Sequence, residues 1–204
     1  MPVACPVDLD AQKLRTEVST IYARVALDPS GQFHFHRGPA YAAEFLNYDP
    51  AELAALPADC TASFAGVGNP HRIASIRPGE TVLDIGSGAG MDLLLAARRV
   101  GSAGRAIGVD MTDGMVERAR RSAAAAGLRQ VEVRKGDATR LPVQDASVDV
   151  VISNGVLNLV PEKEKAFSEI FRVLRPGGRL QLADVVVEVE LTEDDRSNID
   201  LWAG

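Results

Sequence analysis

One short segment constrains the fold more than any other part of the chain. The mostly apolar run Val82–Ile85 (VLDI) leads directly into the glycine-rich run Gly86–Gly90 (GSGAG). The residues that follow, Asp92–Val100, have the length and composition of a helix. Glycines between a strand and a helix let the backbone approach a ligand closely and point amide groups toward it. The segment therefore predicts a strand, a ligand-binding loop and a helix in succession.

The same alternation continues along the C-terminal part of the chain. Strands are predicted at Thr81–Ile85, Arg105–Val109, Val131–Val133, Val148–Ser153 and Arg179–Val187. Helices are predicted between them at Asp92–Val100, Thr112–Ala126 and Glu162–Leu174. This alternation is typical of a mostly parallel sheet with helices on both faces. We expect residues 78–204 to form a doubly wound α/β domain with strand order 3-2-1-4-5.

Residues 1–77 have a different pattern, in which we expect helices and no strand. Apolar residues from Leu14 to Val25 recur at three- and four-residue steps, which predicts an amphipathic helix that ends near Asp28. Asp49 precedes a proline and lies three residues before Glu52, so it is expected to cap a second helix. Asn69–Pro70 predicts a third helix in the same way. We interpret residues 1–77 as a helical cap on the ligand-binding domain.

Composition and charge exclude several classes of function. The chain has 22 Lys and Arg against 28 Asp and Glu, and its formal charge of -6 would repel a phosphate backbone, so nucleic acid is not an expected partner. Cys5 and Cys60 are the only cysteines and form no close pair, which fits a reducing cytoplasm. Neither an export signal nor a membrane-spanning run is recognisable. We therefore expect a cytoplasmic protein without a membrane partner.

Acidic residues around the glycine loop indicate which ligand binds there. Asp110 ends the second predicted strand, twenty residues after Gly90, where a carboxylate can bind both hydroxyls of a ribose. Met91 stands where a dinucleotide-binding motif has glycine. The charge of Asp84 disfavours a pyrophosphate but favours a ligand with an amino group and a sulfonium. We expect S-adenosylmethionine, and a nicotinamide-dependent oxidoreductase is the less favoured alternative.

The pattern D-x-G-x-G-x-G of Asp84–Gly90 resembles the first motif of class I S-adenosylmethionine-dependent methyltransferases. The resemblance implies a Rossmann-like fold in which Asp137 accepts a hydrogen bond from the adenine amino group. Since the first and fourth strands are neighbours, the methyl group is expected near Asn154, Gly155 and Val156. The residues expected to bind the cofactor are Asp84, Gly86, Ser87, Gly88, Gly90, Asp110, Met111, Asp137, Ala138, Asn154 and Gly155.

From about Ala65 onward the chain is similar to the arsenite methyltransferase branch of these enzymes. The matching segments include Gly66–Pro70 (GVGNP) and Ala146–Leu159 (ASVDVVISNGVLNL). In that branch, cysteines that bind trivalent arsenic, a soft ion, stand at the positions of Val67 and Gly155. Because this chain lacks both cysteines, we expect methyl transfer to another small-molecule acceptor. Arsenite methylation and a catalytically inactive cofactor-binding protein are the alternatives.

The acceptor side of the site is less well defined by the sequence. A carbon or oxygen acceptor needs a base, for which the candidates are the three histidines His34, His36 and His71. If Gln32–His36 is extended, its two histidines point to one face, but two ligands do not make a metal site and no metal is expected. The missing Cβ of Gly155 would admit a bulky organic acceptor; a turn that requires positive φ is the alternative.

The C-terminal part has room for fewer strands than the seven expected of this superfamily. After the fifth strand only one helix is predicted, opened by Thr192 with Asp195 at its third position. The fifth strand would then be a sheet edge ending in the apolar run Val185–Val187, and natural proteins seldom leave such an edge bare. We expect the last strands to be missing and a homodimer, or aggregation, through this edge.

Overall fold

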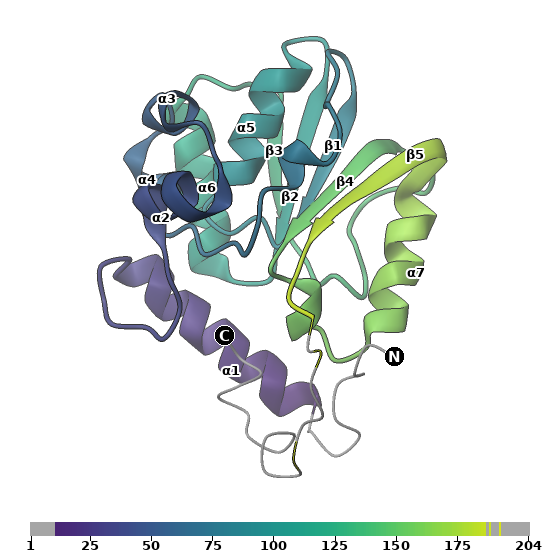
Figure 1. The fold of residues 1–204 in the computed structure, drawn as a ribbon. Helices are drawn as coiled ribbons and strands as arrows, with labels where there is room; N and C mark the ends of the chain where they lie inside the picture. The colour runs from purple at the N-terminus through teal and green to yellow at the C-terminus, as the bar shows by residue number, and fades with distance from the viewer. Residues whose placement is uncertain (1–10, 187, 189–191, 193–204) are drawn as a thin grey trace.

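A five-stranded parallel sheet with strand order β3-β2-β1-β4-β5 forms the centre of the computed structural model, which describes residues 11–186, 188 and 192 (Figure 1). Its strands are β1 (Thr81–Ile85), β2 (Arg105–Asp110), β3 (Val131–Lys135), β4 (Val148–Asn154) and β5 (Leu174–Ala183). Every neighbouring pair in this order runs parallel. The predicted α/β fold and its strand order are confirmed.

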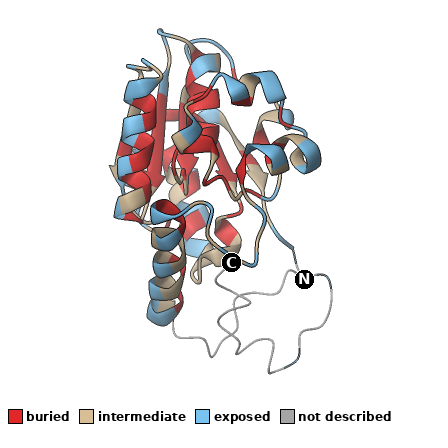
Figure 2. Cartoon of the chain, turned by 90° about the vertical axis from the view of Figure 1, so that its left-hand side faces the viewer, coloured by how far each residue is buried: buried red, intermediate tan, exposed pale blue. Residues whose placement is uncertain are grey.

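Helices cover both faces of this sheet. They are α1 (Ala11–Leu27), α2 (Gly38–Leu46), α3 (Pro50–Ala54), α4 (Ala58–Thr61), α5 (Met91–Val100), α6 (Asp113–Ala125) and α7 (Lys163–Val173), with 3-10 turns η1 (Pro70–Arg72) and η2 (Leu157–Leu159). Alternate residues of β1 face opposite layers: Val82 packs with α5, and Leu83 packs in the cluster that contains residues of α7. The central strands are therefore buried on both sides, as the red colour in Figure 2 shows.

The segment before β1 contains helices and turns, as predicted. The Asp49 carboxylate accepts a hydrogen bond from the Ala51 N–H and caps α3, and the Asn69 side chain caps η1 in the same way through the His71 N–H. The helix expected after Asn69 is only one 3-10 turn. Its Pro70 carbonyl accepts hydrogen bonds from the Ile73 N–H within the turn and from the Gln181 side chain of β5 at 2.8 Å, so the turn is attached to the sheet.

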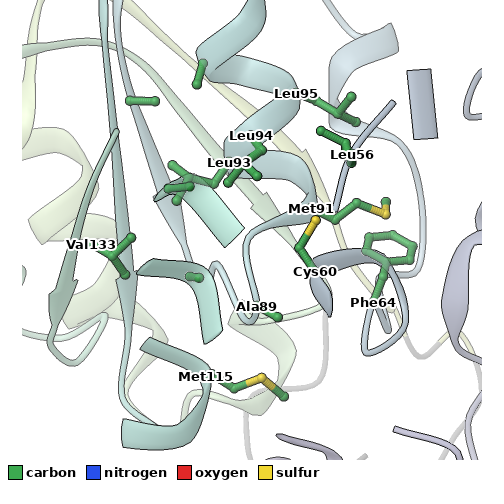
Figure 3. Close-up of a cluster of buried hydrophobic side chains, with 14 of the residues drawn as sticks. Leu56, Cys60, Phe64, Ala89, Met91, Leu93, Leu94, Leu95, Met115 and Val133 are labelled. Carbon is green, nitrogen blue, oxygen red and sulfur yellow. The ribbon is translucent and has the colours of Figure 1, made fainter. Parts of the chain in front are cut away.

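The N-terminal helices share a hydrophobic core with the sheet domain. One buried cluster joins residues of α1, α3 and α4 to residues of α5 and α6. Figure 3 shows Cys60 and Phe64 of the N-terminal segment beside Met91 at the start of α5. Arg118 of α6 also connects α6 to the end of α1 and to α4, because its guanidinium donates to the Ala26 carbonyl and to the Asp59 carboxylate. Helix α1 therefore lies fixed across the ends of the strands (Figure 1).

Strand β5 departs most from the sequence prediction. It begins at Leu174, which pairs with Val148 across a β-bulge, and it ends at Ala183. The strand therefore includes Pro176, which lies before the predicted start at Arg179. Val185 and Val186 follow the strand with 51% and 67% of their surface exposed, so they are not part of the sheet edge. Val187 and the helix expected after Thr192 lie outside the described residues.

Candidate active site

The glycine loop between β1 and α5 has two kinds of glycine. Gly86 has φ +66°, and a Cβ there would lie 2.4 Å from Cγ2 of Val156, so the close approach of the loop after β4 requires glycine. Gly88 has φ +52°, and a Cβ there would meet no atom within 4 Å. Gly86 thus packs against protein, whereas the backbone at Gly88 borders open space in which a ligand can lie.

The carboxylate of Asp110 is fixed beside this loop. It accepts hydrogen bonds from the Gly88 N–H and the Thr112 N–H, each at 2.9 Å. Burial raises the pKa of Asp110, and these hydrogen bonds partly oppose the rise. Each carboxylate oxygen has capacity for a further donor, so the residue can also accept from ribose hydroxyls.

The carboxyl group of Asp84 has an oxygen without a hydrogen-bond partner inside the site. Its side chain is buried, with 2% of its surface exposed, and Oδ2 has no hydrogen-bond partner. Burial first, and then the charges of Asp92 and Asp110, raise the pKa of Asp84 well above its ordinary value. A buried ionised carboxylate is costly unless a donor or cation pairs with it. The position therefore favours a ligand that brings positive charge.

A cavity at the carboxyl ends of the strands brings the predicted cofactor residues together. Its lining contains all eleven of them: Asp84, Gly86, Ser87, Gly88, Gly90, Asp110, Met111, Asp137, Ala138, Asn154 and Gly155. Four carboxylates line it, those of Asp84, Asp92, Asp110 and Asp137, with Arg15 as the basic residue among the described lining residues. This charge balance suits a ligand with net positive charge.

Helix α1 closes one side of the cavity with Arg15, Val18 and Tyr22. Arg15 bridges two elements, with Nε 3.3 Å from Asp137 and Nη2 2.6 Å from Glu162. Burial and the charge of Asp110 raise the pKa of Tyr22 to about 12, so this hydroxyl stays protonated at neutral pH. Sequence reasoning missed this contribution. The apolar periodicity of α1 indicates that one face is buried, but it does not say against what.

Asn154 uses its side chain to hold the segment that precedes β1. Its Oδ1 accepts hydrogen bonds from the Val67 N–H at 2.9 Å and the Gly68 N–H at 3.1 Å. Its Nδ2 lies 2.8 Å from the Gly68 carbonyl and 3.0 Å from Oδ2 of Asp92. The amide of this predicted cofactor residue is therefore directed at the protein itself.

The two positions at which the resemblance to the arsenite branch implies cysteines, Val67 and Gly155, face each other. Cγ1 of Val67 lies 3.2 Å from where a Cβ on Gly155 would be. Val67 thus borders the space left by the missing Cβ, which is less open to a bulky acceptor than one interpretation of the sequence had it. The alternative interpretation agrees with the structure, since φ of Gly155 is +68°.

The histidines are not brought together. His34 packs edge-on to Phe35 and His36 stacks on Tyr41, and neither residue lines the cavity. His71 lies behind the lining, where Nε2 is 3.1 Å from Oδ1 of Asp92. No group of three potential metal ligands occurs within the described residues.

Cys60 lines the cavity as a neutral thiol. Its side chain is buried and its Sγ donates to the Pro57 carbonyl at 3.1 Å. Burial raises the pKa of Cys60 to about 12, so at neutral pH it does not supply the thiolate that a soft ion requires. Cys5 lies outside the described residues.

A sheet of this order, with a glycine loop after β1 and a carboxylate at the end of β2, is that of a Rossmann-like fold that binds a nucleoside-containing ligand. Residues 76–203 match the family model described as "Methyltransferase domain". The chain belongs to this family, has S-adenosylmethionine as its cofactor and falls in the arsenite methyltransferase-like branch.

Three similar proteins support the assignment to this branch. The chain is 47% identical over 165 residues to an arsenite methyltransferase of Halobacterium salinarum, covering 81% of this chain and 42% of the relative. It is 31% identical over 204 residues to that of Mus musculus, covering 95% and 53%. A crystal structure of an arsenic(III) S-adenosylmethionine methyltransferase from Chlamydomonas reinhardtii superimposes with a TM-score of 0.65 at 38% identity, covering 71% of this chain and 51% of that one. The chain spans about half the length of these curated relatives.

The described residues contain no helix that is both long and apolar enough to cross a lipid bilayer.

Proposed function

We propose that this chain transfers a methyl group from S-adenosylmethionine to a small-molecule acceptor other than arsenite. The observation that carries the proposal is the buried, unpartnered Oδ2 of Asp84 in a cavity bordered by the glycine loop. In our assignment Asp84 pairs with the amino group of the cofactor, Asp110 accepts from the ribose hydroxyls and Asp137 from the adenine amino group. The open space at Gly88 leaves room for the ligand against the loop.

The chain contributes alignment and exclusion of water. When bound, S-adenosylmethionine would supply a methyl group on a positively charged sulfur, for displacement by the acceptor. The protein orients the two partners, because such a displacement needs an in-line approach. Helix α1 covers the cavity, and Arg15 ties it to Asp137 and Glu162 on the opposite side. Apolar residues after β4, Val156 and Leu159 among them, add to the wall that keeps water out.

The acceptor side argues against arsenite. Val67 and Gly155 stand face to face where two thiolates would be needed, and the nearby thiol of Cys60 is neutral. An uncharged organic acceptor fits this wall better, because Phe64, Val156 and Val160 supply apolar contacts. Arsenite methylation is the second candidate function. It is favoured by the 47% identity to a protein of that name.

Calorimetry and a turnover panel test this proposal together. We expect S-adenosylmethionine to bind and NAD not to bind. We then expect S-adenosylhomocysteine to form with at least one member of a panel of quinols, thiols and phenols, and not with arsenite. Turnover with arsenite alone would establish the second candidate. Cofactor binding without turnover on any acceptor would indicate the catalytically inactive protein.

We also propose that residues 1–77 form the acceptor-side cap on the domain of residues 78–204, and that the protein works in the cytoplasm. The shared core between the N-terminal helices and α5 and α6 supports the first point. Separate expression of residues 78–204 is expected to give a domain that binds the cofactor weakly and turns over no acceptor. Full activity of that domain would contradict the role of the cap.

Association of two copies through the edge of β5 is a further part of the proposal. Strand β5 is the last strand of the sheet, and it pairs with β4 along one side. Exposed Val185 and Val186 follow it directly. Light scattering is expected to give the mass of a dimer, and a monodisperse monomer would contradict the proposal.

A further inference from the structure

Four buried or partly buried polar side chains form a connected cluster at the wall of the cavity, and the proposed mechanism does not use them as acids or bases. They are Tyr48, His71, Asp92 and Asn154, and they come from four separate parts of the chain. We call them the polar cluster. Tyr48 and Asp92 have 4% and 6% of their surface exposed. Burying such a group costs free energy unless its hydrogen bonds are made, so its arrangement is fixed by its partners.

Asp92 is the centre of the polar cluster. Its Oδ1 accepts from the Tyr48 hydroxyl at 2.7 Å and lies 3.1 Å from Nε2 of His71, while its Oδ2 lies 3.0 Å from Nδ2 of Asn154. A carboxylate only accepts, so Nε2 of His71 carries the proton in this pair. Burial and the charge of Asp92 raise the pKa of Tyr48 far above its ordinary value, which keeps its hydroxyl a donor.

Asn154 connects the polar cluster to the backbone on the acceptor side. Its Nδ2 is directed to Asp92, to the Tyr48 hydroxyl at 3.1 Å and to the Gly68 carbonyl, which leaves Oδ1 for the N–H groups of Val67 and Gly68. The orientation of the amide is therefore set jointly by the polar cluster and by the backbone of Val67 and Gly68. With the amide reversed, its NH2 group would face two backbone donors.

The segment held in this way carries the side chain that lies over Gly155. A Cβ on Gly66 would lie 2.3 Å from Nδ2 of Asn154, so the backbone packs directly on the amide. Val67 then projects to within 3.2 Å of the Cβ position of Gly155, at the strand end where the methyl group is expected. A shift of residues 66–68 would move Val67 relative to the acceptor.

We propose that Tyr48 and His71 are positioning residues: through Asp92 and Asn154 they hold Val67 over Gly155 and so determine which acceptors reach the methyl group. This inference rests on the proposed function. It assigns His71 a role through its neighbours, in place of the role of catalytic base that the sequence offered. Tyr48 and His71 do not line the cavity, so changes at these two residues are expected to act on acceptor geometry rather than on contacts with the cofactor.

Three variants and one control test the inference. Tyr48→Phe keeps the ring that packs edge-on to Phe64 and removes the hydroxyl. His71→Leu removes the donor to Asp92, and His71→Gln restores an N–H near the place of Nε2. Tyr41→Phe is the matched control, because its ring stacks on His36 outside the polar cluster. Amide hydrogen exchange by NMR, calorimetry with S-adenosylhomocysteine and acceptor kinetics are measured for each.

In Tyr48→Phe and His71→Leu we expect exchange of the Val67 and Gly68 amide protons to accelerate roughly tenfold or more, because their acceptor is no longer oriented. Affinity for S-adenosylhomocysteine is expected to stay within about twofold, and the KM of the acceptor to rise more than kcat falls. His71→Gln is expected to recover most of both effects, and the control to change neither.

Unchanged exchange of the two amides in both disruptive variants would overturn the inference. So would a loss of cofactor affinity as large as the loss of acceptor turnover, or failure of Tyr48→Phe to fold, since either result would make the role purely structural. The proposed function fails differently: if the wild-type protein turns over no acceptor, the amide exchange and cofactor affinity still decide whether the polar cluster holds residues 66–68.

Discussion

The two sides of the cavity differ in how the groups next to the ligands are hydrogen-bonded. On the cofactor side, Oδ2 of Asp84 and Oγ of Ser87 are buried without a protein partner, and the backbone at Gly88 borders open space. On the acceptor side, the amide of Asn154 and the hydroxyl of Tyr48 are bonded within the protein, although Nδ1 of His71 there has no protein partner. The first side is incomplete until a polar ligand binds, whereas the second holds its own shape. The difference indicates that the cofactor side needs hydrogen bonds from one particular ligand, whereas the acceptor side presents a preformed apolar wall.

The largest effect is expected within the glycine loop. In Gly86→Ala the new methyl group would meet Val156 at 2.4 Å and the residue would have positive φ, so we expect a loss of about 3 kcal/mol of unfolding free energy or no folding at all. Gly88→Ala is the matched control for stability, because it shares the positive φ but meets no atom within 4 Å. We expect it to cost about 1 kcal/mol and to weaken cofactor binding.

Denaturant unfolding measures the loss of stability in the two glycine variants, and calorimetry measures their affinity for the cofactor. Equal destabilisation by both would show that the loop geometry, rather than the contact with Val156, decides the cost. Normal cofactor affinity in Gly88→Ala would show that the ligand does not lie against this part of the loop.

Asp84→Asn is expected to produce opposite changes in binding and stability. Removal of a buried, unpartnered charge is expected to stabilise the free protein by about 1 kcal/mol. The same change removes the partner of a cationic ligand, so affinity for S-adenosylmethionine is expected to fall about thirtyfold or more. Thermal unfolding without ligand and calorimetry with ligand measure the two effects. A variant with unchanged affinity would contradict the role assigned to Asp84.

The raised pKa of Asp84 predicts a pH dependence of binding. The ionised carboxylate binds a cation, so affinity is expected to be full above the raised pKa and to fall as pH falls through it. The folded, ligand-free protein holds this proton more tightly than the unfolded chain does. Its stability from this group is therefore present at low pH and lost as pH rises from the ordinary carboxyl range through the raised pKa.

Calorimetry over a series of pH values, with Asp84→Asn as control, checks this dependence. The control is expected to show a flatter profile. A wild-type affinity that rises toward low pH would have the wrong sign.

Val67→Ala is expected to have the smallest effect. Val67 has 39% of its surface exposed, so loss of two methyl groups is expected to cost less than about 1 kcal/mol of stability. Cofactor affinity is expected to stay unchanged, while the ratio of kcat/KM values between small and large acceptors shifts toward the larger ones. Steady-state kinetics with two acceptors of different size measure this ratio. A change in cofactor affinity without a change in the ratio would remove the distinction between the two sides.

The parts of the site that sequence reasoning anticipated are those encoded locally. The glycine loop, Asp84 and Asp110 each lie at the end of a predicted strand, and the topology of a doubly wound sheet brings strand ends to one crevice. The strand order followed from the same rule. No comparable rule places residues 1–77 relative to the site, because the apolar pattern of a helix indicates only that one of its faces is buried.

The parts that were missed depend on contacts between distant segments. Tyr48 and Asp92 are 44 positions apart in the chain, and Arg15 and Glu162 are 147 apart. Asp92 has the position of an ordinary acidic residue in the first turn of a helix, and no local pattern sets it apart. The early start of β5 similarly depends on its pairing with β4 across a bulge. Such features become visible only when the chain is folded.

A crystal structure with bound S-adenosylhomocysteine tests the central claim most directly. The account predicts ribose hydroxyls within about 3.2 Å of the Asp110 carboxylate, the amino group beside Oδ2 of Asp84 and the ligand backbone against Gly88. The same compound bound elsewhere, or absent from the cavity at saturating concentration, would contradict it. So would a nucleotide phosphate seated at the glycine loop in its place.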